Sequence, residues 1–219
     1  GGGAAGAEGA GGGAELRRSL EEVLALGQQQ RWLMSPEDVV LAPEQVLGQG
    51  HFGVVYCGWH HGLAVAVKTT LRKEDNAGAK HLIAIANEIR ILRHVRHPNV
   101  VLFHGACVEP AKGELLLILE RIHGPNLAHY VKKHGDDSWV QERLQLLIGV
   151  ACALRYLHAQ LPPVVHGDLK GSNVVVEAAL PRAKLVDFGL SRLLTKRAKP
   201  LGGTLDWMAP EIICNTART

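Results

Sequence analysis

The sequence lacks the features that usually mark secreted, zinc-binding, membrane-spanning or nucleic-acid-binding proteins. Its four cysteines are widely separated and form no CxxC pair, which predicts neither a disulfide framework nor a zinc site. A net charge of +3 is too small to favour a nucleic acid or a membrane surface as a partner. The longest apolar stretch, near Leu115–Leu119, is far too short to span a bilayer. The length of 219 residues is enough for one well-buried domain or for two small lobes that share a cleft.

The start of the chain gives no targeting signal. It opens with Gly1 and shows no basic-then-apolar leader. Isolated cysteines mostly serve as small apolar residues, so their pattern favours a reducing compartment. We therefore expect a cytoplasmic location and no membrane segment within this chain. Because the first residue is not methionine, the sequence leaves open whether a signal or membrane segment lies upstream.

The first 43 residues differ in composition from the rest of the chain. Residues 1–14 are almost entirely glycine and alanine, which predicts a disordered tail. Residues 15–43 are expected to form an amphipathic helix, which docks on its own domain or on a partner, followed by a linker at Trp32–Pro43 with two prolines. The apolar residues at helical spacing are Leu16, Leu20, Val23 and Leu24.

From Glu44 onward the pattern predicts five strands with one main helix, then a mostly helical half. This is an α+β, two-lobed arrangement, with lobes at 44–122 and 123–219. The expected strands are at 45–47, 54–59, 63–69, 101–108 and 114–120, with His61-Gly62 as a turn. The expected helices are at about 78–95, with Ile85, Glu88, Leu92 and Val95 on one face, and at about 140–158. The second has a predicted buried stripe of Leu144, Leu147, Ile148, Ala151 and Leu154, and short strands follow at 174–176 and 184–186.

A glycine-rich run opens the strand region. It reads Gly48-Gln49-Gly50-His51-Phe52-Gly53, a GxGxxG pattern that alone is a weak signal. A dinucleotide site would need a helix to open at the last glycine, whereas Val54-Val55-Tyr56 continues as a strand. The run therefore predicts a strand–turn–strand whose amides can close over phosphates, although an ordinary glycine-rich hairpin has the same pattern.

Lys68 ends a strand with the alternation Leu63-Ala64-Val65-Ala66-Val67-Lys68. Period-two geometry puts Ala64, Ala66 and Lys68 on one face, where a flat base can lie against small residues beside a cation. Glu88 lies on the apolar face of the following helix, where a carboxylate is costly unless it is paired. Lys68 is the simplest partner for it, and a purely structural salt bridge is the alternative.

The candidate catalytic residues lie in one loop and one turn. Asp168, Lys170 and Asn173 fall within six residues, and Asp187 follows 14 residues after Asn173. Asp168 is placed to accept or orient a hydroxyl proton, and Lys170 to neutralise a transferring phosphoryl group. Asn173 and Asp187 supply two hard oxygen ligands, which suit Mg²⁺ bound together with phosphates. Taken singly, each aspartate is also typical of a turn or a cap.

Together these motifs form an ordered set. In chain order they are Gly48-x-Gly50-x-x-Gly53, Val65-Ala66-Val67-Lys68, Glu88, His97-Pro98-Asn99, His166-x-Asp168-Leu169-x-x-x-Asn173, Asp187-Phe188-Gly189 and Ala209-Pro210-Glu211. The set resembles the eukaryotic protein kinase signature over about residues 44–219. The resemblance implies a protein kinase-like fold with a five-stranded antiparallel N-lobe and a mostly helical C-lobe. It also implies ATP and Mg²⁺ as cofactors and a protein with a serine or threonine acceptor as substrate.

The resemblance assigns roles residue by residue. Lys68 contacts the α- and β-phosphates and pairs with Glu88, Asp168 is the catalytic base, and Asn173 and Asp187 hold Mg²⁺. Glu120 and Ile122 would meet the adenine through backbone groups, with Leu119 guarding the back pocket and Val55, Ala66 and Val175 enclosing the base. Leu92, Phe103, His166 and Phe188 resemble the stacked regulatory residues of the family.

Details of the motifs indicate the kind of kinase. Lys170 and the pair Gly203-Thr204 resemble serine/threonine kinases, and several runs resemble the tyrosine-kinase-like group near the Raf and mixed-lineage branches. Dual specificity stays open. Gly167 stands where the family usually has an arginine that binds a phosphorylated residue. We therefore expect that phosphorylation between Leu190 and Thr204 is not a strict on-switch.

The chain ends at Thr219, before the helices that normally follow Ala-Pro-Glu in the family. We expect a C-terminally truncated kinase domain with an apolar patch exposed along its long helix. The principal prediction is a serine/threonine kinase. The alternatives are a nucleotide-binding pseudokinase or scaffold, an inactive kinase fragment, and, with little support, an unrelated ATP-binding enzyme.

Overall fold

The chain folds as two compact units. The computed structural model describes residues 8–50, 53–69, 76–111, 114–134, 139–194 and 202–216. The first unit comprises residues 1–89 and 103–121, and the second comprises residues 90–102 and 122–219. A sheet-rich unit and a mainly helical unit confirm the predicted α+β, two-lobed class.

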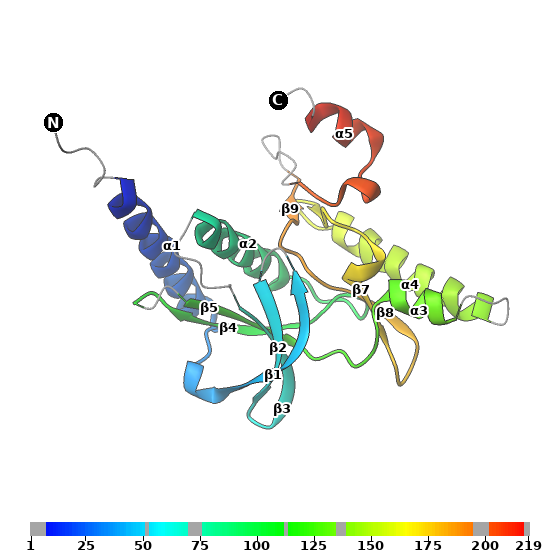
Figure 1. Cartoon of the computed structure of the whole chain (residues 1–219), viewed down its shortest axis with the longest axis horizontal. Helices are drawn as coiled ribbons and strands as arrows, with labels where there is room; N and C mark the ends of the chain where they lie inside the picture. The colour runs from blue at the N-terminus through cyan, green and yellow to red at the C-terminus, as the bar shows by residue number, and fades with distance from the viewer. Residues whose placement is uncertain are drawn as a thin grey trace. The chain divides into compact units, whose positions relative to one another are not determined.

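The first unit contains a five-stranded antiparallel sheet with the helix α2 beside it (Figure 1). Its strands are β1 (Val39–Gly50), β2 (Gly53–His60), β3 (Leu63–Thr69), β4 (Phe103–Glu109) and β5 (Glu114–Glu120), in the order β1-β2-β3-β5-β4. The predicted turn between β2 and β3 is confirmed, since His61 and Gly62 both have positive φ, 48° and 81°. Two positive φ values in succession suit the right-handed twist of a tight hairpin.

The sheet buries apolar residues on both of its faces. Val65 and Val67 of β3 belong to a core cluster with Val39, Cys107 and Ile118. Ala66, between them in sequence, points to the opposite face and is also buried. The helix α2 (Asn76–Leu92) carries Ile85, Glu88 and Leu92 fully buried, as its predicted apolar face requires.

The N-terminal helix α1 (Glu8–Gln30) begins earlier than predicted. It starts at Glu8 rather than Glu15, so the second half of the predicted tail is helical, and residues 1–7 lie outside the described residues. Extension of a helix that already exists is easier than nucleation of a new one, which explains a glycine-rich first turn. Leu20 is fully buried and α1 packs against β4. The helix therefore docks on its own unit.

The predicted linker at Trp32–Pro43 is wrong. Trp32 is buried, and Leu33 forms a parallel bridge with Ala106 of β4. A 3-10 turn at Pro36–Asp38 follows, and β1 begins at Val39. The proline pattern indicated a linker, but β4 is an outermost strand of the sheet and its free edge takes up Trp32–Met34, while the residues from Val39 onward pair with β2.

The second unit is built around one long helix. It contains α3 (Leu127–Lys133), α4 (Val140–His158), β6 (Val164–Val165), β7 (Val174–Glu177), β8 (Arg182–Leu185), β9 (Arg192–Leu193) and α5 (Pro210–Thr216), with 3-10 turns at Gly171–Asn173 and Leu205–Trp207. The strands form two small antiparallel sheets, β6–β9 and β7–β8. The bounds predicted for α4 are confirmed. In the part of the chain that the structure describes, no helix is both long and apolar enough to cross a membrane.

The predicted buried stripe of α4 is wrong. Leu144, Leu147 and Ile148 are exposed, with Leu147 at 59 %, whereas Leu146, Ala153 and Leu157 are buried. Ala151 is also exposed and Leu154 is half-buried. Apolar residues lie on more than one side of this helix, so spacing alone does not identify the side that packs on β6 and β8.

Candidate active site

Lys68 and Glu88 form a buried ion pair in the first unit. The Lys68 Nζ atom lies 2.7 Å from the Glu88 Oε2 atom, and the two residues are 5 % and 0 % exposed. The predicted pairing is confirmed. Removal of one partner from such a pair leaves a buried charge unpaired, at a cost of about 3–5 kcal/mol.

The register of the sheet places small and apolar side chains beside Lys68. Lys68 lies opposite Val55 of β2, and Ala66 lies opposite Leu119 of β5. Directly opposed residues in antiparallel strands point to the same face, and alternation along β3 puts Ala66 and Lys68 on that face too. The structure therefore brings together Val55, Ala66, Lys68 and Leu119.

The two strands on either side of the glycine-rich run pair as predicted. Gly48 pairs with Val55, Gln49 with Val54 and Gly50 with Gly53. His51 and Phe52 lie outside the described residues. A Cβ atom built on Gly48 or Gly50 would meet no heavy atom within 4 Å, so the backbone here is accessible to a ligand. Gly53 has φ 132°, a conformation that favours glycine.

The remaining residues predicted to meet the base lie in different elements. Glu120 is the last residue of β5 and is half-buried, and Ile122 lies in the extended segment after it. Val175 lies in β7 of the second unit, opposite Lys184, and bridges to Asn126.

The second unit holds a compact network around Asp168. The Lys170 Nζ atom lies 2.7 Å from Asp168 Oδ2. Asn173 Nδ2 donates to the Asp168 backbone oxygen at 2.8 Å and to Oδ2 at 2.9 Å. The three residues predicted from one loop therefore meet through direct contacts. A 3-10 turn at Gly171–Asn173 brings Asn173 back toward Asp168.

Thr204 completes this network, and its contact with Asp168 was not predicted from the sequence. Its backbone N and its Oγ1 donate to Asp168 Oδ1 at 2.9 Å and 2.7 Å. Lys170 Nζ in turn donates to Thr204 Oγ1 at 2.6 Å. The pair Gly203-Thr204 was recognised only as a sign of the kinase type. A separation of 36 residues from Asp168 leaves no local spacing that would have revealed the contact.

The network keeps Asp168 ionised. Burial alone would raise the pKa of Asp168, but the hydrogen bonds from Lys170 and Thr204, the charge of Lys170 and the bond from Asn173 outweigh it. The pKa of Asp168 is therefore held below its ordinary value of 3.8. A carboxylate in this state orients a hydroxyl group and accepts its proton late in a reaction, rather than removing it early.

His166 supports the loop as a neutral, buried ring. Burial is the largest cause and lowers the pKa of His166, while the hydrogen bond to the Val186 carbonyl and the charges of Asp187 and Asp168 oppose this effect. The ring packs edge-to-face on Phe188, with centroids 4.8 Å apart. Phe188 and Leu92 are fully buried, and Phe103, in the first unit, is also buried.

Asn173 and Asp187 fit a divalent cation. The Asn173 side chain donates to Asp168 through its Nδ2 atom in both of these hydrogen bonds, so neither uses the amide oxygen that a cation would take. The backbone N of Val186 donates to the Asn173 carbonyl at 3.0 Å, which places Asp187 next to this loop. Asp187 has φ 62°, a left-handed conformation held at this turn. An amide oxygen and a carboxylate are ligands that suit Mg²⁺.

Gly167 lies in close contact with the segment after Asp187. It has φ 84°, and a Cβ atom built on it would overlap the carbonyl oxygen of Leu190. The departure from the family pattern noted at this position therefore has a local structural basis, since a side chain here would force Leu190 to move.

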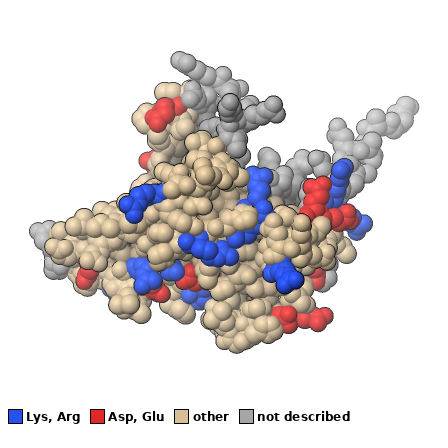
Figure 2. Space-filling view, turned by 180° about the vertical axis from the view of Figure 1, so that it is seen from behind, with Lys and Arg blue, Asp and Glu red and all other residues tan. Residues whose placement is uncertain are grey.

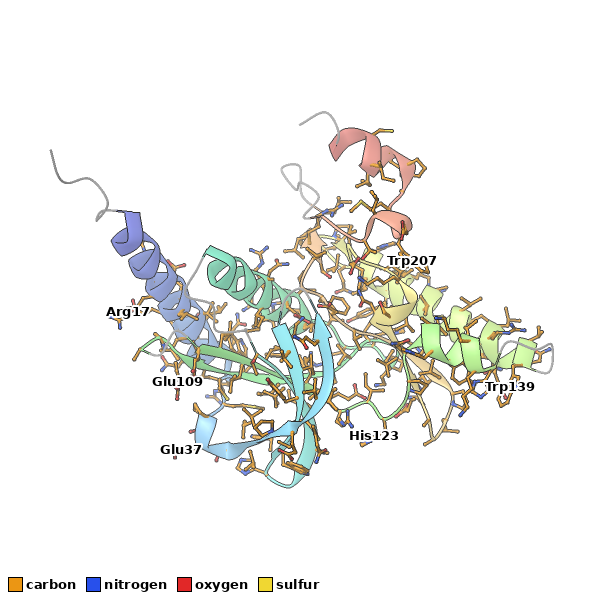
Figure 3. All side chains as sticks on the ribbon, viewed as in Figure 1. Arg17, Glu37, Glu109, His123, Trp139 and Trp207 are labelled. Carbon is orange, nitrogen blue, oxygen red and sulfur yellow. The ribbon has the colours of Figure 1, made fainter. Side chains whose placement is uncertain are left out.

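A cavity of about 190 Å³ lies beside Asp168 within the second unit. Its polar lining comes from Asp168, Thr204 and Arg192. Apolar side chains line the rest, among them Leu169, Met208 and Trp207. Trp207 is 62 % exposed (Figure 3). Asp168 thus lines a space next to the loop that holds the candidate catalytic residues.

The sheet with its paired lysine and the loop around Asp168 define a protein kinase domain. The family model described as "Protein kinase domain" matches residues 41–219. The chain is 36% identical over 175 residues to serine/threonine-protein kinase CTR1 of Arabidopsis thaliana. The matched region covers 78% of this chain and 21% of CTR1. It is 36% identical to the probable serine/threonine-protein kinase SIS8 of the same plant, with 77% and 16% covered. It is 34% identical to the probable serine/threonine-protein kinase drkD of Dictyostelium discoideum, with 79% and 13% covered.

The chain belongs to the protein kinase family. It spans about a fifth or less of the length of these curated relatives.

Proposed function

We propose that this chain is the catalytic part of a serine/threonine protein kinase. It transfers the γ-phosphoryl group of ATP to serine or threonine hydroxyls of protein substrates. The observation that carries the proposal is the network in which Asp168, Lys170 and Thr204 contact one another within 2.6–2.9 Å. The contact between Lys170 and Thr204 joins the two sequence features that resemble serine/threonine kinases.

Each charged residue has one role in this proposal. Lys68, held by Glu88, binds the α- and β-phosphates, with the glycine-rich hairpin above them. Asp168 orients the acceptor hydroxyl and takes its proton as the oxygen bonds to the γ-phosphorus. The bond from that phosphorus to the β,γ-bridging oxygen breaks, and ADP leaves. Lys170 lies 2.7 Å from Asp168, so it can neutralise charge on the phosphoryl group as it moves.

Asn173 and Asp187 would hold Mg²⁺. The bound cation supplies charge neutralisation on the ATP phosphates. The adenine would be met by backbone groups of Glu120 and Ile122, and Val55, Ala66, Leu119 and Val175 would enclose it.

The proposed partners are ATP and a protein substrate in the cytoplasm, and the proposed subgroup is tyrosine-kinase-like. On the face that Figure 2 shows, Lys and Arg side chains lie in several separate groups, some with Asp or Glu beside them. The net charge of +3 supports a protein substrate rather than a nucleic acid.

Transfer of labelled phosphate from Mg-ATP to casein or myelin basic protein tests the proposal, with identification of the phosphorylated amino acid. We expect label on serine or threonine, and a loss of at least a hundredfold in Lys68→Met and Asp168→Asn. Thermal unfolding of each protein shows whether it is folded. Binding of Mg-ATP without transfer by the folded wild-type protein would contradict the proposal and favour a nucleotide-binding scaffold.

A further inference from the structure

Ser191 is a fully buried polar residue close to the catalytic loop. It is 0 % exposed and lies two residues after Asp187-Phe188-Gly189. Its Oγ donates to the carbonyl oxygen of His166 at 2.7 Å, and its backbone N donates to the Phe188 carbonyl at 3.0 Å. A hydroxyl group is costly to bury unless it is hydrogen-bonded, so this bond explains why a serine is tolerated here.

The accepting carbonyl belongs to the peptide that leads into Asp168. His166 is followed by Gly167, whose φ of 84° directs the chain toward Asp168. Any Cβ atom on Gly167 would overlap the Leu190 carbonyl oxygen, so Leu190–Ser191 lies directly against this peptide. The Ser191 hydroxyl is thus linked to the main chain only two residues before the carboxylate that the proposed reaction uses.

The other contacts between the two segments lie farther from Asp168. β6 and β9 pair Val164 with Leu193 and Val165 with Arg192. Beyond them, the Leu194 backbone N donates to the Pro163 carbonyl at 2.7 Å. These main-chain bonds hold residues 163–165, and the Ser191 hydroxyl adds a bond at the His166 carbonyl. The Asp168 backbone N also donates to His166 Nδ1, at 3.4 Å, so the Ser191 bond acts together with this contact. The His166 ring has a separate contact, because its Nε2 atom lies 3.1 Å from the Val186 carbonyl oxygen.

We propose that Ser191 is a positioning residue for Asp168, which acts through the hydrogen bond of its unphosphorylated hydroxyl and not as a phosphate acceptor. The inference rests on the proposed kinase function. It adds that the bond from the Ser191 hydroxyl to the His166 carbonyl keeps Asp168 in position for the reaction. Loss of the bond leaves the His166 carbonyl without this donor and lets the peptide before Asp168 shift. A small shift of a reacting group lowers turnover far more than it changes substrate binding.

The test compares Ser191→Ala, Ser191→Asp and Ser191→Thr with the exposed-serine control Ser35→Ala. We expect Ser191→Ala to lower kcat about tenfold with an unchanged KM for ATP, because Lys68 and Glu88 are untouched. Ser191→Thr keeps the hydroxyl group and should recover activity to within about threefold, whereas Ser191→Asp should be no better than alanine. Ser35→Ala should match the wild type. If the alanine variant does not fold, Ser191→Cys, with its weak thiol donor, takes its place.

A second measurement is independent of catalysis. Amide hydrogen exchange over residues 163–170 should be faster in Ser191→Ala than in the wild type, and peptide mapping of active protein should find no phosphate on Ser191. Wild-type kcat in Ser191→Ala, or phosphate on Ser191 with an active Ser191→Asp variant, would overturn the inference. A failure of the proposed function is distinguishable, because it would appear as no transfer by the wild-type protein itself.

Discussion

Asp168 accepts hydrogen bonds on both of its carboxylate oxygens, and this sets how the proposed reaction responds to pH. Donation from Lys170, Thr204 and Asn173 holds the pKa of Asp168 below 3.8 in spite of its burial. Asp168 is therefore fully ionised throughout the neutral range. A base with so low a pKa is present at full concentration at any physiological pH, but it is a weak proton acceptor.

We therefore predict that kcat at saturating Mg-ATP shows no inflection from Asp168 between pH 6 and pH 8. A depressed carboxylate pKa removes activity only when the pH falls toward that pKa. The measurement is kcat against pH for the wild type and for Asp168→Glu. An inflection inside this range that moves in the glutamate variant would show that Asp168 titrates there.

His166 links protonation to stability. Its pKa is lowered below the ordinary value of 6.5, chiefly by burial, so the folded protein favours the neutral ring. The unfolded chain then binds more protons than the folded one as the pH falls below about 6.5. The contribution of His166 is complete above that pH and is lost below it. Exposed His94 and half-buried His97 also have lowered pKa values, through desolvation and nearby arginines, and act in the same direction.

We predict a lower Tm at pH 5.5 than at pH 7.5, and a smaller drop in His166→Phe, which keeps an aromatic ring but cannot titrate. The variant should lose some stability at both pH values, because the bond to the Val186 carbonyl is removed. His123→Asn, at an exposed position (Figure 3), serves as the control and should keep the wild-type drop. Equal drops in His166→Phe and the wild type would contradict the role of His166.

At the scale of elements, the segment after α1 forms part of the first unit. Arg31 ends α1 with φ 58°, and the Trp32 backbone N donates to the Gly27 carbonyl at 3.2 Å. The Trp32 ring then packs edge-on against Phe103 of β4, with centroids 6.0 Å apart. The backbone N of Ala106 donates to the Trp32 carbonyl at 3.2 Å, and the Ala106 carbonyl accepts from the Met34 backbone N at 2.9 Å. This segment covers the free edge of β4 at the strand's own hydrogen-bonding groups.

Trp32→Ala should therefore destabilise the fold by about 3–5 kcal/mol, the usual cost of emptying a buried aromatic site. Trp207→Ala removes the same kind of side chain from an exposed position and should cost much less, so it is the matched control. Urea unfolding of both variants measures the difference. A loss below about 1 kcal/mol in Trp32→Ala would mean that the segment is only loosely attached.

The elements that could be predicted are those whose signal is local. Alternation in β3 gave both faces of the strand correctly, and the apolar spacing of α4 gave its bounds. The same spacing failed for the buried side of α4, because contact with β8 selects that side and several sides of the helix are apolar. The Trp32–Pro43 segment was misread because its first residues bond to β4, about 70 residues away in sequence, and its last residues form the start of β1.

The site divides in the same way. Lys68 and Glu88 could be paired from sequence because a carboxylate on an apolar helix face needs a cation. Thr204 and Ser191 could not be assigned, since a threonine or serine fits equally well in a solvated loop. Only the fold brings their hydroxyls to Asp168 and to the His166 carbonyl. Short-range chemistry was therefore predictable, and contacts over 25 to 36 residues were not.

At the scale of the whole molecule, residues of both units have roles in the proposed function. Lys68 belongs to the first unit, and Asn173 and Asp187 belong to the second. A ligand that binds only the folded chain raises the free energy of unfolding, and the increase grows with the ligand's concentration and affinity. The thermal stability of the whole chain is thus a readout of Mg-ATP binding that requires no phosphoryl transfer.

We predict that Mg-ATP at about one hundred times its Kd raises Tm by about 5–10 °C, because that excess contributes about 2.7 kcal/mol to a chain of this size. Chelation of Mg²⁺ with EDTA should remove most of the shift, as should Asp187→Asn, which leaves a neutral amide in place of a metal-ligating carboxylate. Lys68→Met should reduce the shift without chelator. Its own stability will change as well, because Glu88 is then buried without its cation, so each variant is compared with and without nucleotide. A full shift in both variants would mean that ATP binds elsewhere on the chain.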